Sequence, residues 1–159
     1  MGESGRYMSR FRGRFDYTLD AKGRLNIPAK FRKALSPEAS ETFVVCRAPN
    51  GCLRAYAQDV WNKYEDELSS RPQTPETLRH QRLVYNTLAE STLDAQGRIT
   101  LTNLQMQMAG LSKDVSLIGQ YGYIEVWDTS RFNEYVGNQE DFDDVFFKSV
   151  ESGVKKIDR

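Results

Sequence analysis

One short motif occurs twice in this chain, and this repetition constrains the fold more than any other feature. Residues 19–25 read Leu-Asp-Ala-Lys-Gly-Arg-Leu, and residues 93–99 read Leu-Asp-Ala-Gln-Gly-Arg-Ile. Farther along, residues 51–56 align with residues 122–127, and the match continues from Trp61 and Phe132. Stretches that match in the same order indicate two copies of one unit. We place the copies at residues 14–60 and 89–131.

Each copy has the pattern of short strands joined by turns. Polar and apolar residues alternate on both sides of Asp20–Gly23, which predicts two strands joined by a tight turn. Pro28 ends the second strand and suits the start of a short helix that reaches Leu35. The predicted strands of the first copy cover residues 13–17, 24–27, 43–46 and 52–56. Those of the second copy cover residues 98–101, 115–118 and 123–127, with a helix near 129–137.

The segments outside the copies have a helical pattern. Residues 61–88 form a predicted helical connector, in which Thr74 and Pro75 suit the start of a helix that ends near Ala89. Residues 132–159 form an acidic tail rich in phenylalanine, which is either a docking helix or a disordered end, with helix favoured.

A unit of about 45 residues with four short strands buries too little surface to be stable alone. The second copy supplies a partner within the same chain, so we expect the two copies to interlock around a pseudo-two-fold axis. The predicted fold class is therefore mainly β with short helices, an α+β fold.

Composition argues against several classes of protein. The chain has one histidine and two cysteines, and neither His80 nor the pair Cys46 and Cys52 has partners at metal-ligand spacing. We expect no metal site, no cofactor and no small-molecule substrate. A phosphate loop, a Gly-x-Ser-x-Gly motif and a nucleophile–base set are all missing from the sequence, so the chain is predicted not to be an enzyme. Its apolar runs are too short to span a membrane and its start does not resemble a signal peptide, so we expect a cytoplasmic protein.

Charge is distributed unevenly although the net charge is zero. Residues 1–35 hold nine basic and three acidic residues, a balance of +6, whereas residues 134–151 have a balance of −5. This basic head predicts a polyanionic partner such as double-stranded DNA, and the alternative is an ordinary solvated surface. The candidate DNA-binding residues are Arg12, Arg14, Lys22, Arg24, Lys30, Arg32 and Lys33.

The repeated motif also predicts two structural pairs, Asp20 with Arg24 and Asp94 with Arg98. Each arginine follows a tight turn and can bond the aspartate across it. We expect Arg24 also to contact DNA and Arg98 to be structural. The second copy has a balance of −2 over residues 89–131, so the first copy is expected to dominate DNA affinity.

The doubled Asp-x-x-x-Arg turn resembles the AbrB-type swapped-hairpin DNA-binding fold, and its tandem form is similar to the MraZ family. The residues that carry the resemblance are 11–13, 19–28, 94–98, 109–111 and 124–127. The resemblance implies two tandem SpoVT/AbrB-like β-barrel units interlocked as an intramolecular pseudo-dimer. It also implies a bacterial transcriptional repressor that binds short direct repeats upstream of its own division and cell-wall gene cluster, associates with the nucleoid, and closes into a ring-shaped homo-oligomer.

The sequence departs from the family pattern in two places. Residues 1–9 extend beyond the usual start near Phe11, and residues 101–104 read Leu-Thr-Asn-Leu where the family tends to have proline. An alternative function is a ring-forming scaffold or protein-interaction module whose basic face binds DNA only non-specifically.

Overall fold

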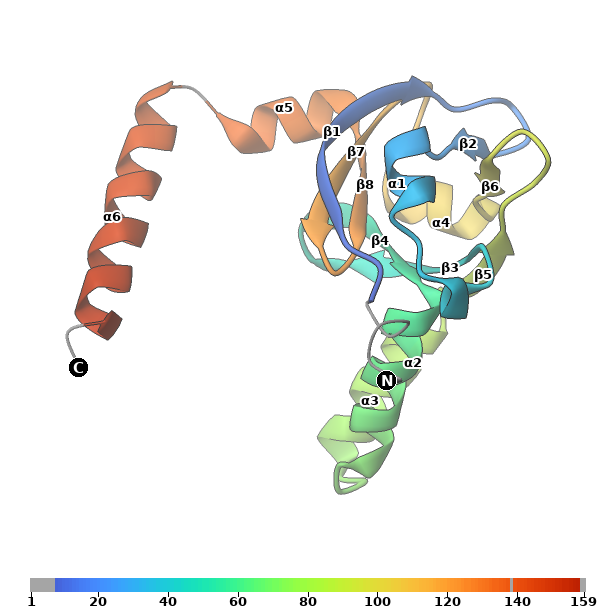
Figure 1. The fold of residues 1–159 in the computed structure, drawn as a ribbon, viewed down its shortest axis with the longest axis horizontal. Coiled ribbons are helices and arrows are strands. Elements are labelled where there is room, and N and C mark those ends of the chain that lie inside the picture. Colours follow the sequence, from blue (N-terminus) through green and yellow to red (C-terminus); the bar gives the residue numbers. More distant parts are fainter. Residues whose placement is uncertain (1–7, 138, 158–159) are drawn as a thin grey trace. The chain divides into compact units, whose positions relative to one another are not determined.

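The computed structural model describes residues 8–137 and 139–157, which form two compact units. One unit ends at Asp128 and the other begins at Thr129 (Figure 1).

The first unit is built on an antiparallel sheet of six strands in the order β1-β7-β8-β4-β3-β5. A second sheet has two short strands, β2 and β6. With its short helices this is an α+β fold, as predicted. The strands are β1 Phe11–Thr18, β2 Arg24–Asn26, β3 Thr42–Ala48, β4 Cys52–Ala57, β5 Ala89–Thr92, β6 Arg98–Thr100, β7 Asp114–Tyr121 and β8 Ile124–Asp128.

Strand pairing joins the two copies of the repeat. Strand β1 of the first copy pairs with β7 of the second, and β5 of the second pairs with β3 of the first. Strand β2 pairs with β6 so that Leu25 lies opposite its equivalent, Ile99, and β4 pairs with β8 so that Arg54 lies opposite Glu125. Pairs of equivalent positions of this kind define a pseudo-two-fold axis. The assignment of each copy of the repeat as a swapped hairpin stays a prediction.

Two equivalent short helices, α1 (Ala29–Lys33) and α4 (Asn103–Met108), lie on the concave side of the curved sheet (Figure 1). The core lies between them and the sheet, and Phe31, Leu25 and Ile99 are almost fully buried in it. Pro28 precedes α1, whereas Thr102 begins α4 with a capping box: its hydroxyl accepts from the Gln105 amide, and the Gln105 side chain accepts from the Thr102 amide. Thr102 therefore provides a helix start at the position equivalent to Pro28.

Helices α2 (Gln58–Ser70) and α3 (Pro75–Tyr85) follow β4. Thr74 caps α3 by accepting a hydrogen bond from the Thr77 amide, as its position predicted. The expected end of this helix near Ala89 is wrong, because residues 89–92 pair with β3 as strand β5. Two further helical turns, Pro37–Ala39 and Pro49–Gly51, are of the 3-10 type.

Ser9, which lies in the expected N-terminal extension of residues 1–9, is part of the fold. Its side chain is buried, and its amide and hydroxyl both donate to the Asp59 carboxylate in the first turn of α2, at 3.0 Å each. Its hydroxyl also accepts from the Ser36 amide at 2.8 Å. Residues 1–7 of this extension lie outside the described residues.

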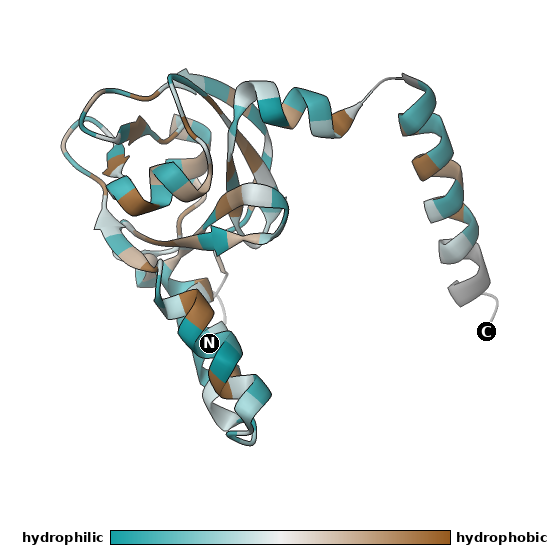
Figure 2. Cartoon of the chain, turned by 180° about the vertical axis from the view of Figure 1, so that it is seen from behind, coloured by the Kyte–Doolittle hydropathy of each residue, from teal (hydrophilic) through white to brown (hydrophobic). Residues whose placement is uncertain are grey.

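The second unit consists of α5 (Thr129–Val136) and α6 (Gln139–Ile157). The tail is thus helical, which is the alternative that the sequence favoured. Apolar residues alternate with hydrophilic ones along α6 (Figure 2). Five of its large apolar side chains are exposed, namely Phe142, Val145, Phe146, Phe147 and Val150.

Candidate nucleic-acid interface

The first turn, between β1 and β2, is held together by the Asp20 carboxylate. Its Oδ1 accepts hydrogen bonds from the amides of Lys22 at 3.0 Å and Arg24 at 2.8 Å. Its Oδ2 accepts from Nε of Arg24 at 2.5 Å. These bonds, above all the one from the Arg24 amide, lower the pKa of Asp20 below its ordinary value. The Lys22 side chain remains exposed at the tip of the turn.

The second turn repeats this geometry around Asp94. The Asp94 carboxylate accepts from the amides of Gln96 at 2.9 Å and Arg98 at 3.0 Å, and from Nε of Arg98 at 2.9 Å. The hydrogen bond from the Arg98 amide is the main cause of the lowered pKa of Asp94. One difference is that Arg98 also donates to the Gln96 side chain at 2.9 Å. The structure therefore joins both of the predicted Asp–Arg pairs.

A basic pocket lies between β1 and α1. It has a volume of about 280 Å³ and is lined by Arg10, Arg12, Lys30, Phe31 and Ala34. The structure thus brings together Arg12 and Lys30, two of the predicted residues, and adds Arg10. Alternation along an extended chain places Arg10 and Arg12 on the same face, and this signal could have identified Arg10 from the sequence.

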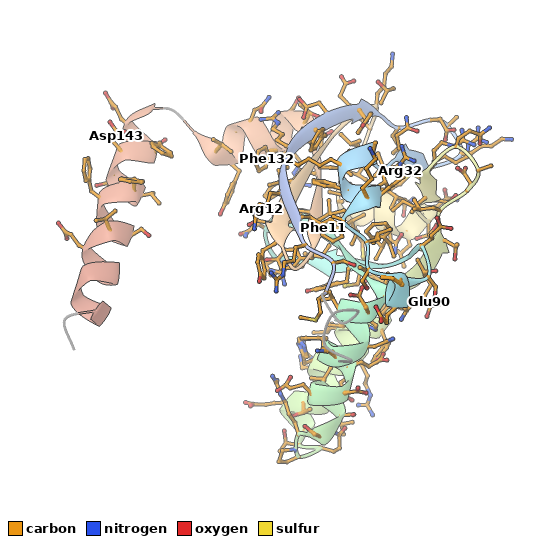
Figure 3. All side chains as sticks on the ribbon, in the orientation of Figure 1. Phe11, Arg12, Arg32, Glu90, Phe132 and Asp143 are labelled. Carbon is orange, nitrogen blue, oxygen red and sulfur yellow. The ribbon has the colours of Figure 1, made fainter. Side chains whose placement is uncertain are left out.

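The remaining predicted residues lie elsewhere. Arg14 forms an ion pair with Asp16, with Nε 3.0 Å from Oδ1, so a neighbouring carboxylate offsets its charge. Lys33 is exposed in the last turn of α1. Arg32 lies on α1 (Figure 3) and donates from Nε to the Ile27 carbonyl at 3.0 Å. Of the seven candidates, Arg12 and Lys30 are thus the two that line the basic pocket.

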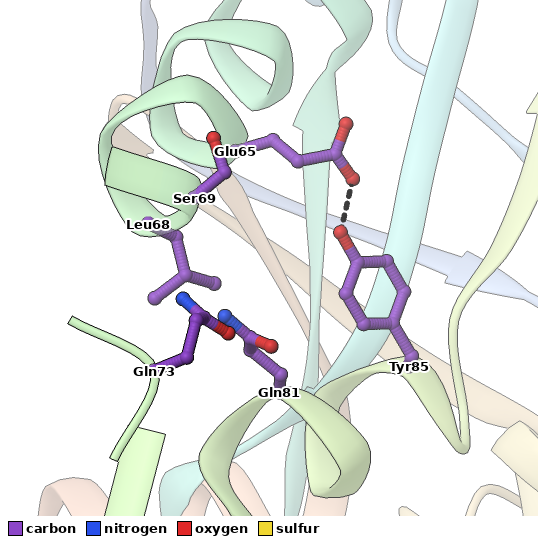
Figure 4. A pocket seen from close by; sticks show the side chains of 6 residues that line it. All are labelled: Glu65, Leu68, Ser69, Gln73, Gln81 and Tyr85. Atoms are coloured by element: carbon purple, nitrogen blue, oxygen red, sulfur yellow. Dashed lines mark hydrogen bonds between the residues drawn. The ribbon is translucent and has the colours of Figure 1, made fainter. Parts of the chain in front are cut away.

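A second pocket, of about 200 Å³, lies between α2 and α3 (Figure 4). Its Glu65 carboxylate accepts hydrogen bonds from the Tyr85 hydroxyl and, at 3.1 Å, from the indole of Trp61. The bond to Glu65 raises the pKa of Tyr85 to about 12. Because these polar groups satisfy one another and Trp61 is buried, we interpret this cluster as structural support for the helix pair.

Neither a metal-binding cluster nor a membrane-spanning helix is present among the described residues. Within residues 8–137 and 139–157, no group of three or more His, Cys, Asp or Glu side chains is arranged to hold a metal ion. In the same part of the chain, no helix combines the length and the apolar character that crossing a membrane requires. His80 is exposed, and its Nε2 lies 3.1 Å from the Tyr64 hydroxyl. Both cysteines are free and buried.

Comparison with known proteins identifies similar sequences along most of the chain. Residues 10–83 and 87–150 match the family described as "MraZ protein, putative antitoxin-like". A protein of Nitratidesulfovibrio vulgaris named transcriptional regulator MraZ is 39% identical over 145 residues, which cover 91% of this chain and 96% of that protein. A protein of the same name from Acetivibrio thermocellus is 38% identical over 130 residues, which cover 81% of this chain and 88% of that protein. Transcriptional regulators are not enzymes, so these names support the prediction that the chain is not an enzyme.

Proposed function

The chain belongs to the MraZ family of transcriptional regulators, and from this premise we propose that it regulates transcription by binding double-stranded DNA sequence-specifically. In detail, we propose a nucleoid-associated repressor that binds short direct repeats in the promoter of its own division and cell-wall gene cluster. The finer features rest on the family resemblance of the sequence.

One observation carries the DNA-binding proposal most directly. The first turn is rigidly held by Asp20, and it presents the Lys22 ammonium at its exposed tip with the Arg24 guanidinium just behind. A fixed tip with two cations suits contact with phosphate oxygens, and Arg24 has donors beyond those that bond Asp20. The basic pocket lined by Arg10, Arg12 and Lys30 adds further positive charge to the same unit.

Competition binding tests this proposal. A fluorescent fragment of the protein's own promoter should stay bound in a large excess of unrelated competitor DNA, and a scrambled fragment should be displaced. If both fragments are displaced equally, binding is non-specific and the scaffold alternative is favoured. The proposal would then fail.

The exposed apolar side chains of α6 favour association with other protein chains as well. We therefore propose that the regulator works as a homo-oligomer, and that head-to-tail contacts between copies close it into a ring.

A further inference from the structure

Arg32 belongs to the first repeat but lies against the turn of the second. A Cβ atom added to Gly97 would lie only 2.8 Å from Nε and 2.9 Å from Cζ of Arg32. Ile27, whose carbonyl holds the Arg32 guanidinium, donates its own amide to the Gly97 carbonyl at 3.0 Å. The guanidinium therefore packs directly on the second turn, where Gly97 leaves room for it.

The first turn has the same arrangement with a neutral side chain. A Cβ atom on Gly23 would lie 3.1 Å from Cε of Met106, and the Leu101 amide donates to the Gly23 carbonyl at 2.8 Å. Met106 follows Arg32 at the repeat offset of 74 residues, so the two positions are equivalent. Each short helix thus covers the turn of the opposite repeat, and only the second turn receives a cation this way.

Because α1 of the first repeat covers the second turn, it changes the charge of that turn. The second copy has a balance of −2 as a segment, but in the folded chain its turn carries Arg32 in addition to Arg98. Arg98 and Arg24 are each paired with the aspartate of their own turn. Within residues 8–137, neither Lys22 nor Arg32 takes part in an ion pair, so each turn presents one cation that no carboxylate of these residues neutralises.

We propose that the second turn is a second phosphate-binding site for DNA and that Arg32, supplied by the first repeat, is its principal cation. The inference rests on the proposed DNA-binding function and deepens it. A guanidinium is a strong donor to phosphate oxygens, and Arg32 is exposed even though its Nε is bonded to Ile27. The phosphates would lie beside Gly97, where the packed guanidinium has a fixed orientation.

Two matched substitutions test the role of the charge. Arg32→Gln removes the cation but keeps an amide that can donate to the Ile27 carbonyl. Met106→Gln makes the equivalent change over the first turn without altering the charge. Because Arg32→Gln removes one phosphate contact, it should flatten the slope of log affinity against log salt concentration by about 0.9. Met106→Gln should leave this slope unchanged. Circular dichroism establishes that both variants are folded.

The position of the second turn relative to DNA is tested separately by tethered cleavage. Ala21→Cys and Ala95→Cys place one thiol on each exposed turn at equivalent positions. Native Cys46 and Cys52 are buried, and burial raises their pKa to about 11 and about 12, so an iron–EDTA reagent will label the introduced thiol selectively. Both labelled variants should cleave bound promoter DNA, each at its own positions.

Phosphate binding at the second turn requires both results. Unchanged affinity and salt slope for Arg32→Gln would overturn it, as would cleavage from Ala21→Cys without cleavage from Ala95→Cys. An equal loss for Arg32→Gln and Met106→Gln would also overturn it, because it would show that packing over the turns matters and not charge. Failure of the proposed function looks different: the unsubstituted protein would then show no preference for its promoter, and neither labelled variant would cut at defined positions.

Discussion

At the scale of single residues, Arg24 has both a structural and a binding role. Its Nε bonds Asp20, which leaves the outer guanidinium nitrogens available to DNA. We expect Arg24→Ala to cost about 1–3 kcal/mol of specific binding if the side chain reads a base. Arg24→Lys should recover only non-specific binding, because lysine keeps the charge and loses the planar fork. Fluorescence anisotropy with promoter DNA and with scrambled DNA measures the specific and the non-specific binding of each variant.

Arg98→Ala is the matched control for the loss of stability alone, because it breaks the equivalent pair on the second turn. Circular dichroism and thermal unfolding of both variants report the structural loss. If Arg24→Ala is well folded and binds its promoter normally, this arginine is purely structural.

At the scale of elements, the two turns should respond to acid. Amide hydrogen bonds lower the pKa of both Asp20 and Asp94 in the folded state. The two ionised carboxylates therefore stabilise the folded state above the ordinary carboxyl pKa of about 4. This stabilisation is lost as the pH falls through the lower pKa values that the two groups have in the folded protein. Urea unfolding from pH 6 to pH 3 should show a larger loss of stability in the unsubstituted protein than in the Asp20→Asn, Asp94→Asn double variant. Equal pH dependence would contradict this prediction.

The capping box that begins α4 gives a second prediction for an element. Thr102→Ala removes the hydroxyl that accepts from the Gln105 amide and should lower the free energy of unfolding by about 0.5–2 kcal/mol. Thr100→Ala, at an exposed position two residues earlier, should change it by less than about 0.5 kcal/mol. Urea denaturation of the two variants distinguishes a lost cap from a general effect of removing threonine.

The sequence was sufficient to predict elements whose pattern is local. Alternating residues predicted β2, and Pro28 and Thr74 predicted the starts of two helices. Strand β5 was missed because residues 89–92 have no large apolar side chain, and they become a strand by pairing with β3, nearly 50 residues away. The placement of Arg32 was missed for the same reason, since only the interlocking of the two copies brings α1 to the second turn.

At the scale of the whole molecule, the interlocking of the two copies changes which residues supply the positive charge at each turn. The first copy supplies cations to both turns, so its residues should still dominate DNA affinity. We expect Lys22→Ala to weaken binding and flatten its salt dependence by about 0.9 in log–log slope, because a lysine releases a counterion from the phosphates. Gln96→Ala at the equivalent tip should leave the slope unchanged. Equal losses in a salt titration of the two variants would contradict the asymmetry.

Association of whole chains is the second prediction at this scale. Among the described side chains of α6, the five exposed apolar ones are 46–66% accessible to solvent, an unusual amount for one helix of a monomer. The +6 balance of residues 1–35 and the −5 balance of residues 134–151 favour contact between the head of one copy and the tail of another. Repeated head-to-tail contacts close into a ring when the rotation between copies allows it. We therefore expect an oligomer larger than a dimer.

Light scattering at micromolar concentration measures this assembly against the chain mass of 18.3 kDa. Replacing two apolar side chains, Phe142→Glu with Phe146→Glu, should lower the mass, because burying two carboxylates in a contact between copies is unfavourable. Lys148→Glu makes the charge more negative by the same two units, at an exposed position on the opposite face of the helix, and should not lower the mass. High salt should also weaken the oligomer, because it screens the attraction between head and tail. A stable monomer of the unsubstituted protein would show that α6 does not join copies of this chain.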